Sequence, residues 1–159
     1  MTDGRSVAES GDPQREVRIA AVRLLARREH TREELRRKLT RRGYPASCIE
    51  AAIAALEDAS YVSDTRFAEM FVRVRAERGQ GPVKIRAELR ERGVAESLVD
   101  EVLTETANYW LNHARVARRK RFGDGIPSER NEWNRQARFL AQRGYPSDLI
   151  YRALSVEVD

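Results

Sequence analysis

The sequence is poor in the residue types from which most catalytic and metal centres are built. Among its 159 residues there are only one cysteine, two histidines, two tryptophans and four phenylalanines. A single cysteine, Cys48, excludes an intramolecular disulfide and a four-cysteine zinc site, and we expect it to be a small core residue. His30 and His113 lack carboxylate or cysteine neighbours at ligand spacing, so we interpret both as surface or boundary residues. The sequence predicts no metal site.

Motifs of catalysis and cofactor binding are also missing. The chain has no P-loop, no dinucleotide-binding glycine motif after a strand, no nucleophile elbow and no HExxH pair. The glycine-rich stretch at 79–82, GQGP, is too short and too constrained by proline to surround a phosphate chain. Adjacent carboxylates such as Glu33 and Glu34 point about 100° apart on a helix, which suits solvation better than acid–base chemistry. We expect a protein that is not an enzyme and has no cofactor.

The sequence contains no long apolar run and no recognisable leader peptide. No stretch is long enough to span a membrane, and residues 1–15 are polar with three carboxylates, which a secretory leader would avoid. These absences predict a cytoplasmic protein without a membrane partner. We expect residues 1–15 to form a disordered tail.

What the chain does contain is a repeat. The stretch at 31–56, TREELRRKLTRRGYPASCIEAAIAAL, resembles one at 81–103 and more faintly one ending at 139–154. In each copy a basic helix ends at an Arg-Gly corner, and an apolar helix with negative charges follows. One more helix is predicted before each copy, whereas no segment shows the alternation of a strand.

The predicted fold is therefore all-α, with three tandem three-helix repeats at 16–62, 63–106 and 107–159. A period of about 50 residues indicates units stacked in a line, which would form an elongated, curved rod. Local signals support the boundaries of the helices. Thr31 and Glu34 have the spacing of a capping box, and Gly43 is placed to end a helix in a left-handed conformation.

Charge is segregated by helix, although the net charge of the chain is only +5. The middle helices are basic: 31–42 has six positive and two negative charges, 84–92 has four and two, and 130–143 has four and one. The third helices are acidic, with three negative charges in 46–58, four in 95–105, and three against one positive charge in 147–159. We call the middle helices the basic ridge and the third helices the acidic ridge.

Two partners would suit these ridges. A polyanion could follow the basic ridge, and a basic protein surface could meet the acidic ridge. Charged helical faces are also often only solvated, and three copies of one pattern make the two interpretations about equal. The densest positive run, at 115–121, favours the polyanion because five like charges in seven residues repel one another unless something neutralises them.

These patterns give a set of predicted contacts to DNA or to a filament. The set comprises basic residues of the first two units and of the run at 115–121: Arg36, Arg37, Lys38, Arg75, Lys84, Arg86, Arg115, Arg118, Arg119 and Lys120. Trp133 is the one aromatic residue that we weigh as a platform for a base, because aromatics at helical spacing usually belong to a core.

The central part of the chain resembles the central motif of the RecX regulatory proteins. It contains SDTRFA at 63–68, Phe71-Val72, Gly81-Pro82, Glu88-Leu89 and Gly93-Val94. The stretches around Gly43-Tyr44 and Gly144-Tyr145 are similar to the first and third repeats of that family. The resemblance extends over about 17–154 and implies three tandem three-helix repeats.

The resemblance also implies a function that periodicity cannot supply. It implies regulation of RecA by binding in the groove of the RecA–DNA filament, which limits filament extension, strand exchange, ATP hydrolysis and the coprotease activity of the SOS response. The implied partners are RecA on DNA and single- and double-stranded DNA bound weakly without sequence specificity, and we expect a monomer.

Two other functions remain open from the residues alone. The first is a stand-alone DNA-binding protein built from helix-turn-helix-like units, although no helix stands out as a recognition helix. The second is a helical-repeat adaptor that binds a protein and no nucleic acid. Strong preference for one DNA sequence would favour the first, and partner binding without nucleic acid would favour the second.

Overall fold

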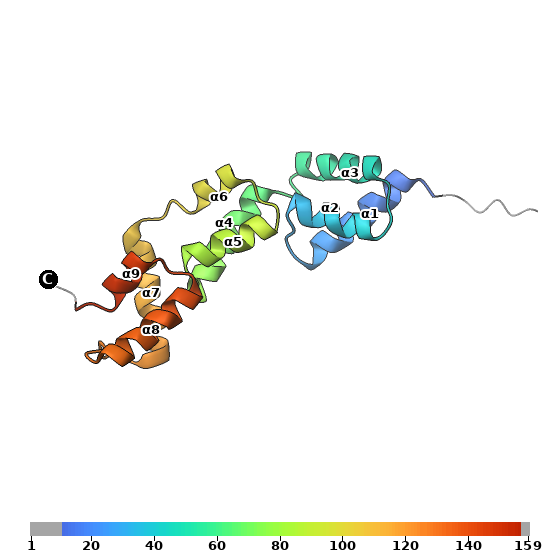
Figure 1. The fold of residues 1–159 in the computed structure, drawn as a ribbon. Coiled ribbons are helices and arrows are strands. Elements are labelled where there is room, and N and C mark those ends of the chain that lie inside the picture. Colours follow the sequence, from blue (N-terminus) through green and yellow to red (C-terminus); the bar gives the residue numbers. More distant parts are fainter. Residues whose placement is uncertain (1–10, 157–159) are drawn as a thin grey trace, which may run out of the picture. The chain divides into compact units, whose positions relative to one another are not determined.

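The computed structural model describes residues 11–156 and contains, over that range, nine helices and no strand. The helices are α1 Pro13–Arg27, α2 Arg32–Arg41, α3 Ala46–Asp58, α4 Asp64–Glu77, α5 Pro82–Glu91, α6 Glu96–Val102, α7 Ala107–Phe122, α8 Arg130–Arg143 and α9 Ser147–Ala153 (Figure 1). The prediction of an all-α chain with three sets of three helices is confirmed. Side-chain packing groups these sets into two compact units, which meet between Asp64 and Thr65 in the sequence.

The N-terminal unit is a three-helix bundle in which α1, α2 and α3 all contact one another. Its core is formed by residues at i, i+3, i+4 and i+7 on α1 and α3, as the periodicity predicts, and by Leu35 and Leu39, one turn apart, on α2. Alanines at the centre allow the helices to approach closely. The buried apolar residues are Val17, Ala20, Ala21, Leu24, Leu35, Leu39, Ile49, Ala52, Ile53, Leu56 and Val62. Cys48 packs partly buried against this core.

The first helix begins earlier than the sequence analysis predicts. Residues 13–15 were expected in a disordered tail, but α1 starts at Pro13, and the Asp12 carboxylate accepts a hydrogen bond from the Gln14 backbone N–H at 3.1 Å. Proline suits the first helical position, where its missing N–H would have no intrahelical partner. The Gln14 amide then donates to the Cys48 carbonyl at 3.1 Å, which ties this turn to α3. Residues 1–10 of the predicted tail lie outside the described residues.

The predicted signals at the start and end of α2 are confirmed. The Thr31 hydroxyl accepts from the Glu34 N–H at 3.0 Å and so satisfies one N-terminal donor. Gly43 has φ +86°, and its N–H donates to the Thr40 carbonyl at 3.0 Å. The left-handed residue therefore ends the helix where the Arg-Gly corner was placed.

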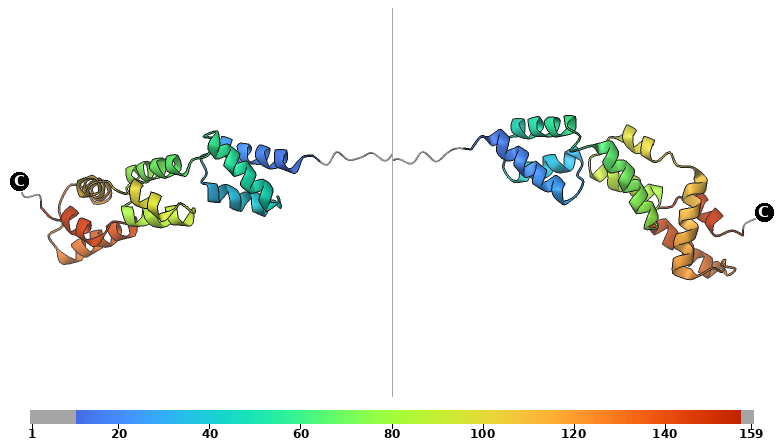
Figure 2. Two further views of the ribbon diagram at one scale, coloured as in Figure 1. Left: turned by 90° about the horizontal axis from the view of Figure 1, so that it is seen from above. Right: turned by 180° about the vertical axis from the view of Figure 1, so that it is seen from behind.

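The C-terminal unit contains α4 to α9 around one continuous core. That core runs from Phe67 in α4 to Leu154 after α9, and it includes both Trp110 and Tyr145. Within it α5 contacts α6, and α7, α8 and α9 contact one another (Figure 2). The second and third helix sets thus share a core, whereas the first set has its own.

A close backbone joint links the second and third sets. The Gly81 N–H donates to the Arg143 carbonyl at 2.7 Å, and the Val83 N–H donates to the Gly144 carbonyl at 3.0 Å. A Cβ on Gly81 would lie 2.5 Å from the Gly144 carbonyl, so only glycine allows this approach. The Tyr145 hydroxyl donates to the Gly79 carbonyl at 3.1 Å, and burial raises the pKa of Tyr145. The GQGP stretch is therefore a structural joint.

Candidate anion-binding site

The predicted basic and acidic ridges face each other within a unit. In the N-terminal unit the Arg36 guanidinium binds both carboxylate oxygens of Glu50 on α3, at 2.5 and 3.1 Å, and also pairs with Glu33. These hydrogen bonds, that to Glu50 first, raise the pKa of Arg36, and the pKa of Glu50 is lowered by the same contact. The positive charge of Arg36 is thus largely neutralised by the neighbouring helix.

The second helix set repeats this pair 50 residues further along the chain. Arg86 Nη1 donates to Glu96 at 2.8 Å and to Asp100 at 2.7 Å, and Arg90 binds Glu96 through two bonds of 2.7 and 2.6 Å. The bond from Arg90 lowers the pKa of Glu96 to about 2. The two ridges therefore supply some of each other's counter-charges in these two sets, and a separate partner for each ridge stays a prediction.

Two further predicted contacts are engaged in the same way. Arg37 pairs with Glu33 one turn earlier at 3.3 Å, and Arg75 pairs with Glu88 at 3.4 Å. Such half-exposed pairs hold side chains in place more than they add stability. Their positive charges are therefore partly balanced within the fold.

Lys38 contacts a histidine that the sequence analysis placed wrongly. Lys38 Nζ lies 2.9 Å from Nε2 of His30, and Nδ1 of His30 lies 3.0 Å from the Arg28 carbonyl oxygen. His30 is only 1% exposed, so the expectation of a surface or boundary residue is wrong. The ring is buried because it fills the turn between α1 and α2.

Arg118 is a second correction, because it is 2% exposed and cannot contact DNA from that position. Its guanidinium donates to the Gly125 and Asp124 carbonyls at 2.9 and 3.2 Å, and it lies 3.4 Å from the Gln136 amide oxygen. Burial lowers the pKa of Arg118. This side chain holds the loop between α7 and α8.

Within the part of the third helix set that the structure describes, 107–156, there is no counterpart of the ion pair between middle and third helices. Ala137 and Tyr151 occupy the positions that correspond to Arg86 and Asp100. Trp133 packs partly buried against the core, with its ring 6.3 Å from that of Tyr151. Base stacking by Trp133 stays a prediction.

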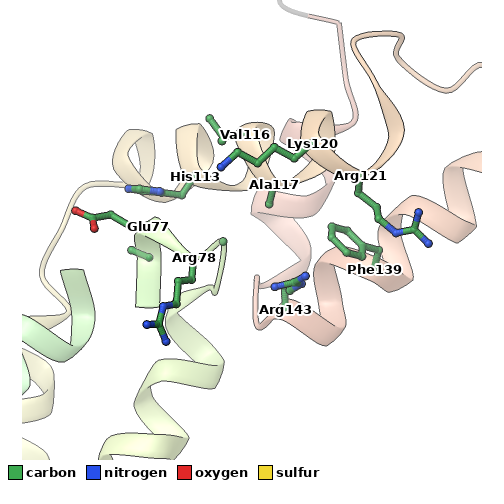
Figure 3. A pocket seen from close by; sticks show the side chains of 11 residues that line it. Glu77, Arg78, His113, Val116, Ala117, Lys120, Arg121, Phe139 and Arg143 are labelled. Carbon is green, nitrogen blue, oxygen red and sulfur yellow. The ribbon is translucent and has the colours of Figure 1, made fainter. Parts of the chain in front are cut away.

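Three cations of the third set, Lys120, Arg121 and Arg143, and Arg78 of the second set line a hollow of about 270 Å³ in the C-terminal unit. It lies between the turn after α4, the exposed face of α7 and the C-terminal half of α8 (Figure 3). Gly79, with φ +85°, packs closely against Ala117 in the lining of this hollow. A Cβ on Gly79 would lie 3.2 Å from the Cβ of Ala117. The residues around the hollow are Ala76, Glu77, Arg78, Gly79, His113, Val116, Ala117, Lys120, Arg121, Phe139 and Arg143. We call this hollow the basic pocket.

The cations of the basic pocket are held differently from those of the ridge. The Arg143 guanidinium lies over the ring of Phe139 at 5.1 Å, and Arg121 lies over Phe122 at 5.4 Å. The two rings meet edge to face at 5.2 Å, so they form one aromatic support. Within the described residues, no ion pair involves the four pocket cations, Arg78, Lys120, Arg121 and Arg143.

Of the predicted contacts, the structure brings only Lys120 into this pocket. Arg119 and Lys84 are exposed elsewhere on the same unit, and Arg115 is half-buried on α7. Sequence reasoning missed three of the pocket cations: Arg78, Arg121 and Arg143. Arg121 belongs to the basic run at 115–121, and Arg143 belongs to an Arg-Gly corner, so the sequence contained a pattern that could have found these two. It contained no such pattern for Arg78.

Three family models match the chain in order. The model described as the first three-helix domain of RecX matches residues 18–56, the second domain matches 63–103, and the third matches 108–154. The chain belongs to the RecX family. The basic pocket is thus built by the second and third RecX domains together.

Curated relatives agree with this assignment. The chain is 49% identical over 153 residues to the regulatory protein RecX of Halorhodospira halophila, covering 96% of this chain and 94% of that protein. It is 43% identical over 139 residues to the regulatory protein RecX of Pseudomonas savastanoi, covering 87% and 90%. A crystal structure of RecX from Lactobacillus salivarius has a TM-score of 0.79 at 23% identity, covering 90% of this chain and 95% of that one, which shows the shared fold.

Family membership supports a regulatory role for this RecX-family chain, since its relatives are named as regulators. Within residues 11–156 there is no group of three His, Cys, Asp or Glu side chains placed to hold a metal ion. None of the described helices combines the length and apolar character that crossing a membrane would require.

Proposed function

We propose that this protein regulates RecA by binding the filament that RecA forms on DNA. The observation that carries the proposal is the match of all three RecX domains, in order, over nearly the whole chain. Binding in the filament groove would limit filament extension, strand exchange, ATP hydrolysis and the coprotease activity of the SOS response. The protein acts as a binding partner in this proposal and carries out no chemistry itself.

The charge distribution supports contact with DNA in the C-terminal unit. Cations that are already paired with carboxylates release few counterions when a phosphate approaches, whereas unpaired cations release more. Lys84, Arg119 and Lys120 are exposed, and within the described residues no ion pair involves them. These three of the predicted contacts are the ones we retain for DNA, and the paired Arg36 and Arg86 are expected to contribute less.

The test is DNA-stimulated ATP hydrolysis by RecA with this protein titrated in. We expect hydrolysis to fall as the protein approaches equimolar amounts, because filament extension is limited. An unchanged rate at equimolar protein would contradict the proposal. Binding to one DNA sequence much more strongly than to others would instead favour the stand-alone DNA-binding protein, and RecA binding without any DNA would favour the adaptor.

A further inference from the structure

We infer that the basic pocket is a seat for the phosphodiester backbone of a DNA strand. This inference deepens the proposed function and rests on it, because it names where the DNA of the filament is held. It also moves the principal DNA contact from the predicted basic ridge to residues contributed by three separate helices.

Positive charge is in excess around the hollow. Four cations and one carboxylate, Glu77, line it, which leaves an excess of three positive charges. Like charges around one hollow repel one another, and an anion between them removes that repulsion. By contrast, Arg36 on α2 and Arg86 on α5 are already neutralised by carboxylates of the next helix.

Arg78 and Arg143 are not needed as helix caps. Cations near helix C-termini often serve the exposed carbonyls. At these ends, backbone N–H groups do so: Gly79 donates to Ala76, and Gly144 donates to Ala141, at 2.9 and 3.0 Å. The Arg143 carbonyl accepts from Gly81 across the joint. The side chains of Arg78 and Arg143 are thus available for a ligand.

Two guanidinium groups are supported by aromatic rings. The Arg143 guanidinium lies 5.1 Å from the centre of the Phe139 ring, and that of Arg121 lies 5.4 Å from the centre of the Phe122 ring. Contact with an aromatic face leaves the N–H edge of a guanidinium available for hydrogen bonds. A planar fork of donors suits the oxygens of a phosphate.

The pocket is poorly suited to a stacked base and to an enclosed small molecule. Arg143 covers a face of Phe139, the only benzene ring among the lining residues, so stacking of a base there is disfavoured. The volume of about 270 Å³ lies below the range of roughly 300 to 1,000 Å³ typical of enclosed small-molecule sites. A ligand with a single carboxylate would neutralise only part of the excess charge, whereas a DNA strand carries a phosphate at every nucleotide. The pocket therefore suits the phosphodiester backbone of a DNA strand and does not distinguish between base sequences.

The test compares two double variants that remove the same net charge. Arg78→Gln with Lys120→Gln removes two exposed pocket cations, and Arg36→Gln with Arg86→Gln removes two paired cations of the ridge. Binding of a labelled oligothymidine to the full chain is followed by fluorescence anisotropy over a series of KCl concentrations. Thermal unfolding of each variant checks that the fold is intact.

We expect the pocket variant to bind about tenfold more weakly and to flatten the slope of log affinity against log salt by about 1.4, since each phosphate contact on a single strand contributes about 0.7. The ridge variant should change affinity by less than about twofold. Arg143→Lys keeps the charge but loses the planar fork, so an intermediate loss is expected. Equal effects of the two double variants, or no DNA binding by the wild-type chain at low salt, would overturn the inference.

Competitors separate other sources of the anion. Displacement of the oligonucleotide by inorganic pyrophosphate at micromolar concentration would indicate a site for a free phosphate compound and would overturn the strand assignment. Polyglutamate is the second competitor. If the pocket variant loses binding of polyglutamate but keeps binding of DNA, the pocket binds an acidic protein partner, and the strand assignment is overturned. Neither competitor should be effective.

RecA ATP hydrolysis measured with the same variants distinguishes the two proposals. If the wild-type chain leaves RecA unaffected while the pocket variant still loses DNA binding, the proposed function fails and the phosphodiester seat stands. If the chain inhibits RecA and both double variants bind DNA as the wild type does, the seat fails and the proposed function stands.

Discussion

The arginine side chains of this protein take different roles according to what lies within hydrogen-bond distance. Arg36 neutralises a carboxylate on a neighbouring helix, Arg118 is buried and holds two loop carbonyls, and Arg143 lies over a phenylalanine ring. A count of charges along the sequence treats the three alike. Of these three, only Arg143 keeps a positive charge that is available to a polyanion.

His30 gives a prediction at the scale of one residue. As a neutral ring it can donate from Nδ1 to the Arg28 carbonyl and accept at Nε2 from Lys38. Burial lowers its pKa, the positive charges of Arg28 and Lys38 act in the same direction, and the Arg28 carbonyl and Glu34 oppose them. Below the ordinary value of 6.5 the unfolded chain therefore binds a proton that the folded chain resists, so stability falls as the pH drops.

Between pH 7.5 and 5.5 the wild-type N-terminal unit should lose more stability than His30→Gln, because only the wild type has a ring whose pKa is lowered by folding. Hydrogen exchange of amides in 17–62 measures this, because these residues share one core. His113→Gln, in the other unit, is the control and should leave the pH dependence of 17–62 unchanged. An equal pH dependence in His30→Gln and wild type would contradict the prediction.

At the scale of elements, the joint between α5 and the end of α8 is the feature on which the basic pocket depends. Two backbone hydrogen bonds and one from the Tyr145 hydroxyl connect the two segments. Tyr145 and its acceptor, Gly79, are 66 residues apart in the sequence. The joint places the turn after α4 beside α7 and α8, and so brings Arg78 to the other pocket cations. Small residues at the contact are essential to this arrangement.

Gly81→Ala should therefore destabilise the C-terminal unit by about 2 kcal/mol, because a Cβ 2.5 Å from the Gly144 backbone forces the two segments apart. Urea unfolding followed by tryptophan fluorescence reports on this unit, which contains both Trp110 and Trp133. Gly125→Ala is the matched control, since an added Cβ meets nothing within 4 Å, and it should stay within about 0.5 kcal/mol of wild type. A stable Gly81→Ala protein would show that the joint can relax.

At the scale of the whole molecule, the three-fold repeat of the sequence does not translate into three separate cores. The first helix set has a core of its own, and the second and third sets share one. Leu39 and Leu89 occupy equivalent positions in the repeat and are both fully buried, but they belong to different cores. The same substitution at the two sites should therefore affect different parts of the chain.

Leu39→Ala and Leu89→Ala should each cost about 2 to 5 kcal/mol in the core that contains them. In hydrogen-exchange mass spectrometry, Leu39→Ala should accelerate exchange within 17–62 and leave 67–154 near its wild-type rate, and Leu89→Ala should do the reverse. Faster exchange throughout the chain in both variants would mean that the two cores unfold as one.

The sequence alone determined the helices, their repeat and most of their ends, because periodicity, Thr31 at a cap and Gly43 at a corner act over a few residues. It missed the start of α1 at Pro13, where a short cap signal adjoins a polar segment. It also placed the positive charges on the correct helices. Local physics decides each of these features.

Tertiary structure alone decided which charges are available. Arg36 meets a carboxylate 14 residues away on another helix, Arg118 is buried beneath a loop, and the basic pocket combines three helices across the Gly81 joint. Electrostatic neutralisation depends on distances of a few ångströms between side chains that are far apart in the chain. The pattern of charge along the sequence therefore predicted a polyanion partner, and only the fold indicated where one could bind.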